Sequence, residues 1–343
     1  MPSDPQAEPL QAHFLEFLER RPAGCSLYVL GHSDTDGLSA AAILTRSLRE
    51  AGIDSTADVT RKGENAWSAS VAERAGRSGA GAAIVADLGS RSDPLFERMP
   101  VLLIDHHKHT GVPPGGTLLT GYGMDPAPSS GLLAYWCAEA LGTAEGLDWL
   151  AAISLLADLG EKNGFAEYAA ARRKYKAVAL RTVATLVNTP RRVAAGDATG
   201  ALELLLRSTD PQALLVDPGA ETLRAAKAEW DEALAAARRI GPKIRGEIAL
   251  IEVNTPCQVH PVVAQTWVGR LHKNIVICAN AGFLPGRINF AVRTKLPVNL
   301  LEFLARHRPP GAGEDYGRGH DQATGGSLTP ADWSIFLGSL GIA

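Results

Sequence analysis

Short hydrophobic runs that each end in polar residues recur in the first third of the chain. They occupy residues 27–31, 82–86 and 101–104. Runs of this length and composition are typical of buried strands, and the Ala- and Leu-rich stretches 38–49 and 131–141 have the spacing of helices. Buried strands that alternate with helices predict a parallel sheet with crossover helices.

Beyond this region the pattern becomes helical. A periodic hydrophobic stretch covers residues 147–157, and a long helical region is expected from about 165 to 186. The segment Asn-Thr-Pro-Arg-Arg at 188–192 interrupts the pattern, and residues 198–240 have the composition of connecting helices. This part of the chain therefore predicts a helical bridge between two domains.

Strand-like runs return from about residue 246, with the sequences EIALIEV, NIVICAN and GRINFAVRT. Helical stretches at 262–271 and 299–307 accompany them. A chain of 343 residues is long enough to bury two cores. We expect an α/β protein with a parallel-sheet domain over 1–190, a helical linker over 191–245 and a smaller α/β domain over 246–343.

The composition is that of an ordinary folded protein, with 45% hydrophobic and 21% charged residues. A formal net charge of −3 argues against a protein that coats duplex DNA, because such binding depends on a dominant basic surface. It leaves room for a local basic groove. Two basic clusters are candidates for such a groove, although most runs of this kind are solvated helix faces. They comprise Arg172, Arg173, Lys174 and Lys176, and Arg238, Arg239, Lys243 and Arg245.

The four cysteines are far apart and form no CxxC or Cys/His spacing, so we expect neither a disulfide framework nor a structural zinc site. A reducing cytoplasm suits this pattern. The sequence contains no hydrophobic run of bilayer length, and its start lacks the layout of a signal peptide. We therefore expect a cytoplasmic protein that does not enter a membrane.

The first candidate for chemistry is the segment His32-Ser-Asp-Thr-Asp-Gly37, directly after a predicted strand. Alternate residues on an extended turn point the same way, so His32, Asp34 and Asp36 can converge at the strand's carboxyl end, where α/β sheets bind ligands. A capped turn is the simpler interpretation, because Asp and Ser start helices. A calcium loop is disfavoured, since its first position is His and the twelfth is not Glu.

Two further strands end in residues of the same kind. Asp87 follows IVA, and Asp105, His106 and His107 end the run LLIDHH. A single acid after a strand often caps the next helix, but three strands that end in His and Asp indicate a shared site. Oxygen and imidazole ligands without thiolate suit Mn²⁺ or Mg²⁺, with Fe²⁺ or Co²⁺ as alternatives. Asp158, at the end of AAISLLAD, is either a further ligand or a surface helix end.

These motifs, in this order, resemble the DHH phosphoesterase family over roughly the first 160 residues. Near the C-terminus, Gly317, Arg318, Gly319 and His320 are similar to the glycine-rich GGGH motif of the DHHA1 domain, with Arg318 in place of a glycine. Bare glycines let a phosphate or base approach the backbone, and a neighbouring cation can hold its charge. The resemblance implies an active site in a cleft between the two domains.

The resemblance also implies roles for individual residues. One divalent metal ion would be held by His32, Asp34 and Asp87, and a second by Asp36, Asp87, His106 and Asp158. Asp87 would bridge them, Asp105 would orient a histidine, and His107 would face the substrate phosphate. The catalytic set is thus Asp87, Asp105 and His107. The substrate-binding set is His107, Arg293, Gly317, Arg318, Gly319 and His320; Arg293, on the strand INFAVRT, is otherwise a surface residue.

The implied cofactor is a pair of divalent ions, with Mn²⁺ favoured over Mg²⁺ and Co²⁺. Two cations about 4 Å apart make a water acidic enough to attack phosphorus in line. The expected activity is hydrolysis of phosphodiester bonds in single-stranded DNA or short RNA, as in RecJ-like exonucleases and short-oligonucleotide hydrolases. The alternatives are a phosphoesterase for 3′-phosphoadenosine 5′-phosphate or a cyclic dinucleotide, and a non-catalytic nucleic-acid-binding scaffold. The sequence gives no indication of oligomeric state.

Overall fold

The computed structural model describes residues 6–97, 99–313 and 316–342, without the side chain of Arg318. The chain divides into two compact units. The first contains residues 6–191 and 195–225, and the second contains 192–194 and 226–342. The predicted boundaries at 190 and 245 stay a prediction. No helix within the described residues is long and hydrophobic enough to cross a bilayer.

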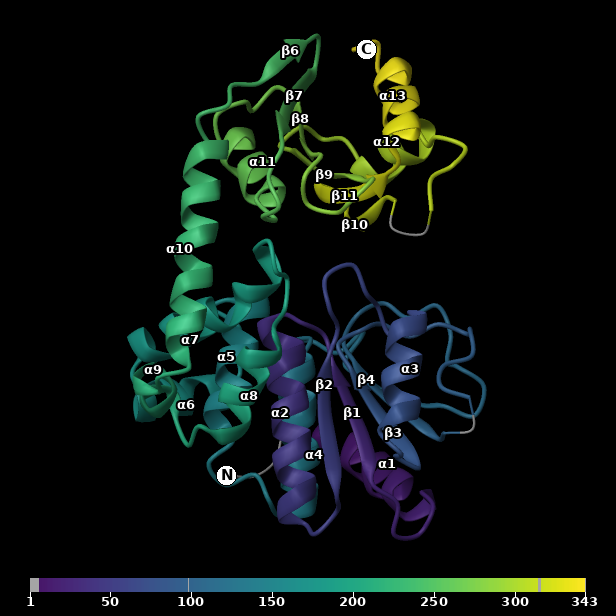
Figure 1. Cartoon of the computed structure of the whole chain (residues 1–343), viewed down its shortest axis with the longest axis vertical. Coiled ribbons are helices and arrows are strands. Elements are labelled where there is room, and N and C mark those ends of the chain that lie inside the picture. Colours follow the sequence, from purple (N-terminus) through teal and green to yellow (C-terminus); the bar gives the residue numbers. More distant parts are fainter. Residues whose placement is uncertain (1–5, 98, 314–315, 343) are drawn as a thin grey trace. The chain divides into compact units, whose positions relative to one another are not determined.

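The first unit is built on a parallel five-stranded sheet in the order β2-β1-β3-β4-β5. Figure 1 shows α2 and α3 on either side of it. The strands are β1 (Leu27–Gly31), β2 (Ser55–Val59), β3 (Ala82–Ala86), β4 (Val101–Asp105) and β5 (Thr117–Thr120). The helices are α1 (Ala7–Arg20), α2 (Thr35–Glu50), α3 (Ala69–Arg77), α4 (Ser130–Leu141), α5 (Asp148–Leu159), α6 (Ala166–Tyr175), α7 (Ala177–Asn188), α8 (Thr199–Arg207) and α9 (Pro211–Val216), with a 3₁₀ turn at Pro190–Arg192.

Alternate strand residues build two cores on the two faces of this sheet. Leu27 and Val29 of β1 pack in the large core with α1, α2, α4 and α5. Tyr28 and Leu30 pack on the opposite face with Val71 of α3. Because both faces are covered, β1, β3 and β4 are buried along their whole length, which explains their uninterrupted hydrophobic sequence. Their carboxyl ends are the edge at which polar residues appear.

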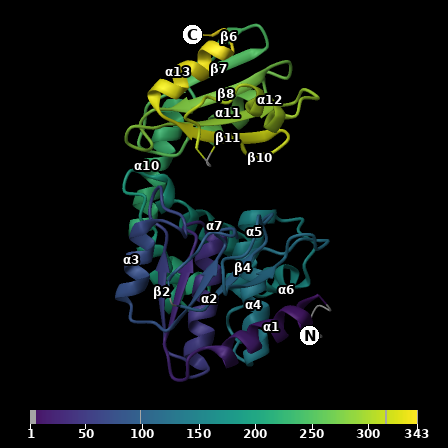
Figure 2. The ribbon, with the colours of Figure 1, turned by 90° about the vertical axis from the view of Figure 1, so that its right-hand side faces the viewer.

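The second unit has a six-stranded mixed sheet in the order β10-β11-β9-β8-β7-β6, whose strands lie side by side in Figure 2. Of the described strands, β7 and β8 pair in parallel, and the other neighbours pair antiparallel. The strands are β6 (Lys243–Arg245), β7 (Ile248–Val253), β8 (Ile275–Asn280), β9 (Ile288–Thr294), β10 (Arg318–His320) and β11 (Ala323–Leu328). The helices are α11 (His260–Val268), α12 (Leu300–Arg306) and α13 (Pro330–Ser339); α10 (Ala220–Ala237) runs from the first unit into the second.

Two cores cover the two faces of this sheet as well. Ile251 and Cys278 face α11, and Leu250 and Ile277 face α12 and α13. The predicted α/β class of both parts is therefore confirmed. The helical region expected at 165–186 is helical in the structure, and it consists of two helices, α6 and α7, which are separated at Lys176. Lys176 has φ of +65°, a left-handed conformation that an α-helix does not continue through.

Candidate metal centre

The end of β1 supplies the first two polar side chains. Asp34 is the N-cap of α2 and accepts a hydrogen bond from the Gly37 N–H at 3.1 Å. The same carboxylate lies 2.9 Å from Nδ1 of His32. A Cβ atom at position 37 would lie 2.5 Å from the Cβ atom of His32, so glycine is needed for the turn to close. The capping interpretation of this motif is right, and the cap also directs His32 and Asp34 to the sheet edge.

Asp87 follows the end of β3 and is buried, with 4% of its surface exposed. Its φ of +64° is uncommon for a residue with a side chain. In this conformation the Asp87 carboxylate lies close to His32 and Ser130. Its Oδ2 lies 3.5 Å from His32 Nδ1, and its Oδ1 accepts a hydrogen bond from the Ser130 hydroxyl at 3.0 Å. Asp87 is therefore adjacent to one side chain that follows β1 and to another at the start of α4.

Asp36 lies in the first turn of α2 and is 3% exposed. Its carboxylate accepts hydrogen bonds from the backbone N–H groups of Ser130 at 2.9 Å and Gly131 at 2.7 Å, and from the Ser154 hydroxyl. The two backbone donors belong to the first turn of α4, where a helix favours negative charge. Asp36 is thereby held in one orientation beneath the sheet edge.

His106 follows β4 and lies among three carboxylates. Its Nε2 is 3.6 Å from Asp36 Oδ2 and 3.6 Å from Asp87 Oδ1, and its Nδ1 is 3.6 Å from Asp158 Oδ2. Asp158 lies at the end of α5 with its side chain 33% exposed. The Nε2 atom of His106 is buried and has no hydrogen-bond partner among the described residues. An imidazole nitrogen in this position is available as a metal ligand.

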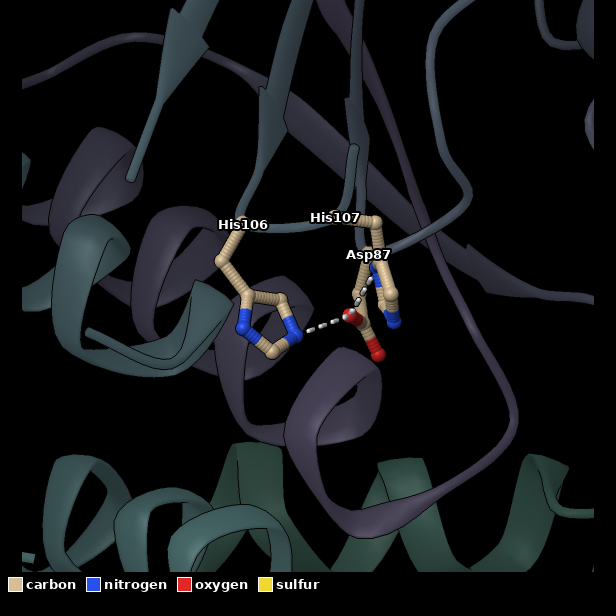
Figure 3. A group of neighbouring side chains, drawn as sticks. All are labelled: Asp87, His106 and His107. Carbon is tan, nitrogen blue, oxygen red and sulfur yellow. Dashed lines mark ion pairs between the residues drawn. The ribbon is translucent and has the colours of Figure 1, made fainter. Parts of the chain in front are cut away.

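His107 and Asp105 form a separate pair at the same edge. Asp105 ends β4 and is buried, and it accepts hydrogen bonds from the Gly89 and His107 N–H groups. Its Oδ1 lies 3.2 Å from Nδ1 of His107, which is also 3.8 Å from Asp87 Oδ1. Figure 3 shows the His106 and His107 rings turned toward the Asp87 carboxylate. Asp105 thus contacts His107, whose side chain is 56% exposed.

The electrostatics of the cluster are those of crowded, desolvated carboxylates. Burial, followed by the charges of Asp36 and Asp34, raises the pKa of Asp87 well above its ordinary value. Burial also raises the pKa of Asp36, to about 6. Anions in such a place are stabilised by a bound cation, since a cation offsets both the lost hydration and the mutual repulsion.

The pKa values of two histidines in the cluster are raised as well, which favours their charged form. Burial lowers the pKa of His32, but the carboxylates of Asp34 and Asp87 outweigh it and raise the pKa to about 10. The hydrogen bond to Asp105 raises the pKa of His107 to about 9, against the effect of burial. Both rings therefore act as local counter-charges for the carboxylates. A divalent cation in contact with the same carboxylates would take over that function.

The donor set fits divalent metal ions. Three groups each place their ligand atoms within 4.8 Å of one another: His32 with Asp34 and Asp87, Asp36 with His106 and Asp158, and Asp87 with His106 and His107. All donors are carboxylate oxygens or imidazole nitrogens, which suit Mn²⁺ and Mg²⁺. The buried Nε2 of His106 has no hydrogen-bond partner in the described part of the chain, and a metal ion would satisfy it.

Comparison with solved structures relates the whole chain to one architecture. A crystal structure of exonuclease RecJ bound to manganese aligns with a TM-score of 0.69 and 21% identity, over 96% of this chain and 93% of the other. RecJ from Thermus thermophilus in complex with Mn²⁺ also gives 0.69, at 20% identity, over all of this chain and 56% of the other. The DHH domain of a member of the s1p family of ribosomal proteins gives 0.64 at 14% identity, covering 98% and 89%.

The chain has the RecJ fold. At these identities the likeness establishes the architecture, and for the fold it confirms the resemblance to the DHH/DHHA1 family. The chain spans about half the length of the Thermus thermophilus RecJ. No family model and no curated protein sequence matches the chain.

Within this RecJ fold, Arg191 is a neighbour of the cluster that sequence reasoning missed. Its Nη2 lies 4.0 Å from Asp34 Oδ2, and its Nε donates a hydrogen bond to Asn188 Oδ1 at 2.9 Å. The guanidinium is mostly buried, with 22% of the side chain exposed. The sequence showed this arginine only as part of a helix break, and the sole available signal was an arginine directly after a proline.

The other predicted site residues belong to the second unit, whereas the whole cluster belongs to the first. Arg293 lies on β9 opposite Ala323 of β11, and His320 of β10 lies opposite the same Ala323. Cross-strand partners share a face, so Arg293 and His320 project from one face of the sheet, two strands apart. Arg293 is partly buried and donates hydrogen bonds to the carbonyl oxygens of Val292 and Thr324.

The glycine-rich motif is part of a hairpin. Gly317 has φ of +78° and Gly319 has φ of +133°, and a Cβ atom at position 319 would lie 2.4 Å from the Ala323 carbonyl oxygen. The exposed His320 ends the strand. The side chain of Arg318, predicted to bind substrate, lies outside the described part of the structure. The predicted position of the active site between the two domains stays a prediction.

Proposed function

We propose that this chain hydrolyses phosphodiester bonds in single-stranded or short nucleic acid, using water activated by two divalent metal ions. The observation that carries the proposal is the cluster at the carboxyl edge of the first sheet. Seven His and Asp side chains from four separate segments lie there within a few ångströms of one another, and six of them are the proposed metal ligands. A group of buried carboxylates and imidazoles is costly without a cation, which argues for a metal site.

Two of the three donor groups match the proposed ligand sets. His32, Asp34 and Asp87 would hold one ion. Asp36, His106 and Asp158 would hold the other, with Asp87 shared, because Asp87 Oδ1 is 3.6 Å from His106 and Asp87 Oδ2 is 3.5 Å from His32. When bound, two such ions lower the pKa of water and neutralise charge on the phosphate oxygens.

The remaining residues would bind the substrate or orient a side chain that binds it. Asp105 holds the His107 ring through the 3.2 Å contact to Nδ1, so that the half-exposed ring is directed by a buried group. His107 would donate a hydrogen bond to a phosphate oxygen, and Arg191 would hold a further oxygen beside Asp34. In the second unit, Arg293, Gly317, Arg318, Gly319 and His320 would bind the nucleotide, with His320 and Arg293 on one face of the sheet.

The neighbours with this fold support the same class of reaction, since one is exonuclease RecJ bound to manganese and another is RecJ in complex with Mn²⁺. Manganese is accordingly the proposed ion, with Mg²⁺ and Co²⁺ as alternatives. The non-catalytic alternative predicts that ligand positions are lost. All six proposed metal positions here carry Asp or His.

The test is a panel of substrates incubated with the chain and Mn²⁺. It contains 5′-labelled single-stranded DNA, RNA dinucleotides, cyclic dinucleotides and 3′-phosphoadenosine 5′-phosphate. The proposal predicts Mn²⁺-dependent cleavage of the linear oligonucleotides, and none after chelation. Exclusive turnover of a cyclic dinucleotide or of 3′-phosphoadenosine 5′-phosphate would establish the small-molecule alternative. Binding of nucleic acid without cleavage of any substrate would establish the scaffold.

A further inference from the structure

A pocket of about 540 Å³ opens on the first unit, beside the end of α5 that carries Asp158. It is formed by the loop after α5 and by the exposed side of α6. Glu161, three residues after Asp158, belongs to its rim. Three residues of chain reach at most about 11 Å, so this side of the rim is close to the metal cluster. The lining residues used below are Glu161, Asn163, Phe165, Tyr168, Arg172 and Arg173.

The floor of the pocket is aromatic and has one free donor. Phe165 and Tyr168 are buried, with 6% and 4% of their surfaces exposed. The Tyr168 hydroxyl is buried and has no hydrogen-bond partner in the part of the chain that the structure describes. Asn163 is satisfied, because it donates to the Gly160 carbonyl oxygen and accepts from the Phe165 N–H. The pocket therefore combines an apolar floor with a hydroxyl that lacks an acceptor.

The rim is cationic. Arg172 and Arg173 are exposed, and among the described residues neither forms an ion pair. The one acid of the rim, Glu161, is already paired with Arg181 at 2.5 Å. Residues 159–181 carry six Lys or Arg and two Glu, in a chain whose net charge is −3. Guanidinium groups and a tyrosine hydroxyl offer donors to a ligand, so the matching ligand is rich in acceptors and negatively charged.

We infer that this pocket, the α6 subsite, binds a segment of single-stranded nucleic acid beyond the scissile phosphate. Arg172 and Arg173 hold backbone phosphates, Tyr168 donates to a sugar or phosphate oxygen, and the apolar floor contacts a base or sugar. The inference rests on the proposed function and sharpens its substrate class. Since the subsite begins beyond Asp158, it adds affinity only for nucleic-acid strands that are long enough to extend from the metal cluster to Arg172 and Arg173. The chain should therefore prefer oligonucleotides over dinucleotides.

The experiment measures binding without hydrolysis. Fluorescence anisotropy follows a labelled octanucleotide and a labelled dinucleotide with the full chain in EDTA. The test variant is Arg172→Gln/Arg173→Gln. Its matched control is Arg20→Gln/Arg77→Gln, two exposed arginines of the same unit with the same change of charge. Tyr168→Phe removes only the unpartnered hydroxyl, so it leaves the packing of α6 in place.

The α6 subsite predicts that the Arg172/Arg173 variant binds the octanucleotide at least tenfold more weakly, with a smaller loss for the dinucleotide. The control stays within twofold of the original chain. The dependence of log affinity on log salt should become shallower by about 1.4, since each single-strand phosphate contact contributes about 0.7. Tyr168→Phe should weaken octanucleotide binding about threefold or more, the lower end expected for one lost hydrogen bond.

Equal affinities of test and control variants for the octanucleotide would overturn the inference. So would a loss that is the same for both ligand lengths. Because the measurement needs no turnover, it is independent of the substrate panel. If the chain cleaves dinucleotides but the Arg172/Arg173 variant binds the octanucleotide as tightly as the original chain, only the α6 subsite is refuted. If the chain cleaves no substrate, the proposed function is refuted.

Discussion

Nε2 of His106 lies 3.6 Å from Oδ1 of Asp87, and the two residues directly follow the adjacent strands β4 and β3. This distance is too long for a hydrogen bond, and the nitrogen is buried without a hydrogen-bond partner among the described residues. A cation between the two atoms would satisfy both of them. The relationship makes Asp87 the residue on which the proposed chemistry depends most.

Asp87→Ala should abolish activity and leave the protein folded. The substitution removes the carboxylate shared by both proposed metal sites, but no hydrophobic side chain of the core. We expect a decrease in turnover of about a thousandfold or more, because a catalytic metal supplies several kcal/mol. The measurement is Mn²⁺-dependent cleavage of a single-stranded oligonucleotide, with circular dichroism as the check on folding.

The matched control is Asp54→Asn, which removes one exposed carboxylate elsewhere in the same unit. It should keep its activity. Mn²⁺-dependent turnover that is unchanged in Asp87→Ala would refute the site.

Metal ions should also stabilise the fold. Mn²⁺ that binds the native cluster and not the unfolded chain adds about 2.7 kcal/mol at a concentration of 100 times its Kd. Differential scanning calorimetry should therefore show a higher Tm with Mn²⁺, and Asp87→Ala should remove the increase. An equal increase in Asp87→Ala would show that the stabilising ions bind elsewhere.

Arg191→Gln should weaken catalysis while leaving metal binding in place. The guanidinium is 4.0 Å from Asp34 Oδ2 and is oriented by Asn188, so it can hold a phosphate oxygen at the edge of the cluster. Loss of one charge-assisted hydrogen bond costs about 1.5 to 3 kcal/mol, which is roughly 10- to 100-fold in kcat/KM.

Arg192→Gln is the matched control for this prediction, because Arg192 belongs to the second unit and its guanidinium lies 5.9 Å from the ring of Trp230. The role of Arg191 is contradicted when both substitutions reduce kcat/KM equally, or when Arg191→Gln has no effect.

The stability of the second unit should decrease in mild acid because of His260. This residue begins α11 and is 5% exposed, and its Nδ1 has no hydrogen-bond partner within the described ranges. Burial, together with the charge of Arg293, lowers the pKa of His260 from 6.5 to about 3. Below pH 6.5 the unfolded chain therefore binds a proton at His260 that the folded chain does not bind. The free energy of unfolding decreases progressively as the pH falls from 6.5 toward 3.

From pH 8 to pH 5 this single group should lower the free energy of unfolding by about 2 kcal/mol. Urea unfolding at both pH values measures the change, and His260→Gln should reduce it by that amount. The same pH dependence in the original chain and in His260→Gln would mean that other groups cause the acid sensitivity.

Much of the first sheet could be predicted from the sequence. The strands that carry Asp87 and His106 are buried on both faces, so their hydrophobic runs are unbroken and their ends are marked by polar residues. Strands β2 and β5 were missed. They lie at the two edges of the sheet and are only partly buried, and STADV and TLLT carry no clear hydrophobic run.

Three-dimensional contacts explain what the sequence could not show. Arg191 lies next to Asp34 because α7 packs against α2 and α5. This packing joins segments far apart in the sequence, so no local pattern predicts it. Lys176 lies within an otherwise continuous helical sequence and gives no sign of its left-handed conformation. The short β10 is a strand because it pairs with β11, although its glycine-rich sequence indicates a loop.

The most direct test of the account is a crystal structure of the chain grown with Mn²⁺, with data collected at the manganese absorption edge. We predict two anomalous peaks in the first unit, one in contact with His32, Asp34 and Asp87, and the other in contact with Asp36, Asp87, His106 and Asp158. Absence of any peak between these side chains at saturating Mn²⁺ would contradict the proposed metal centre and the function that depends on it.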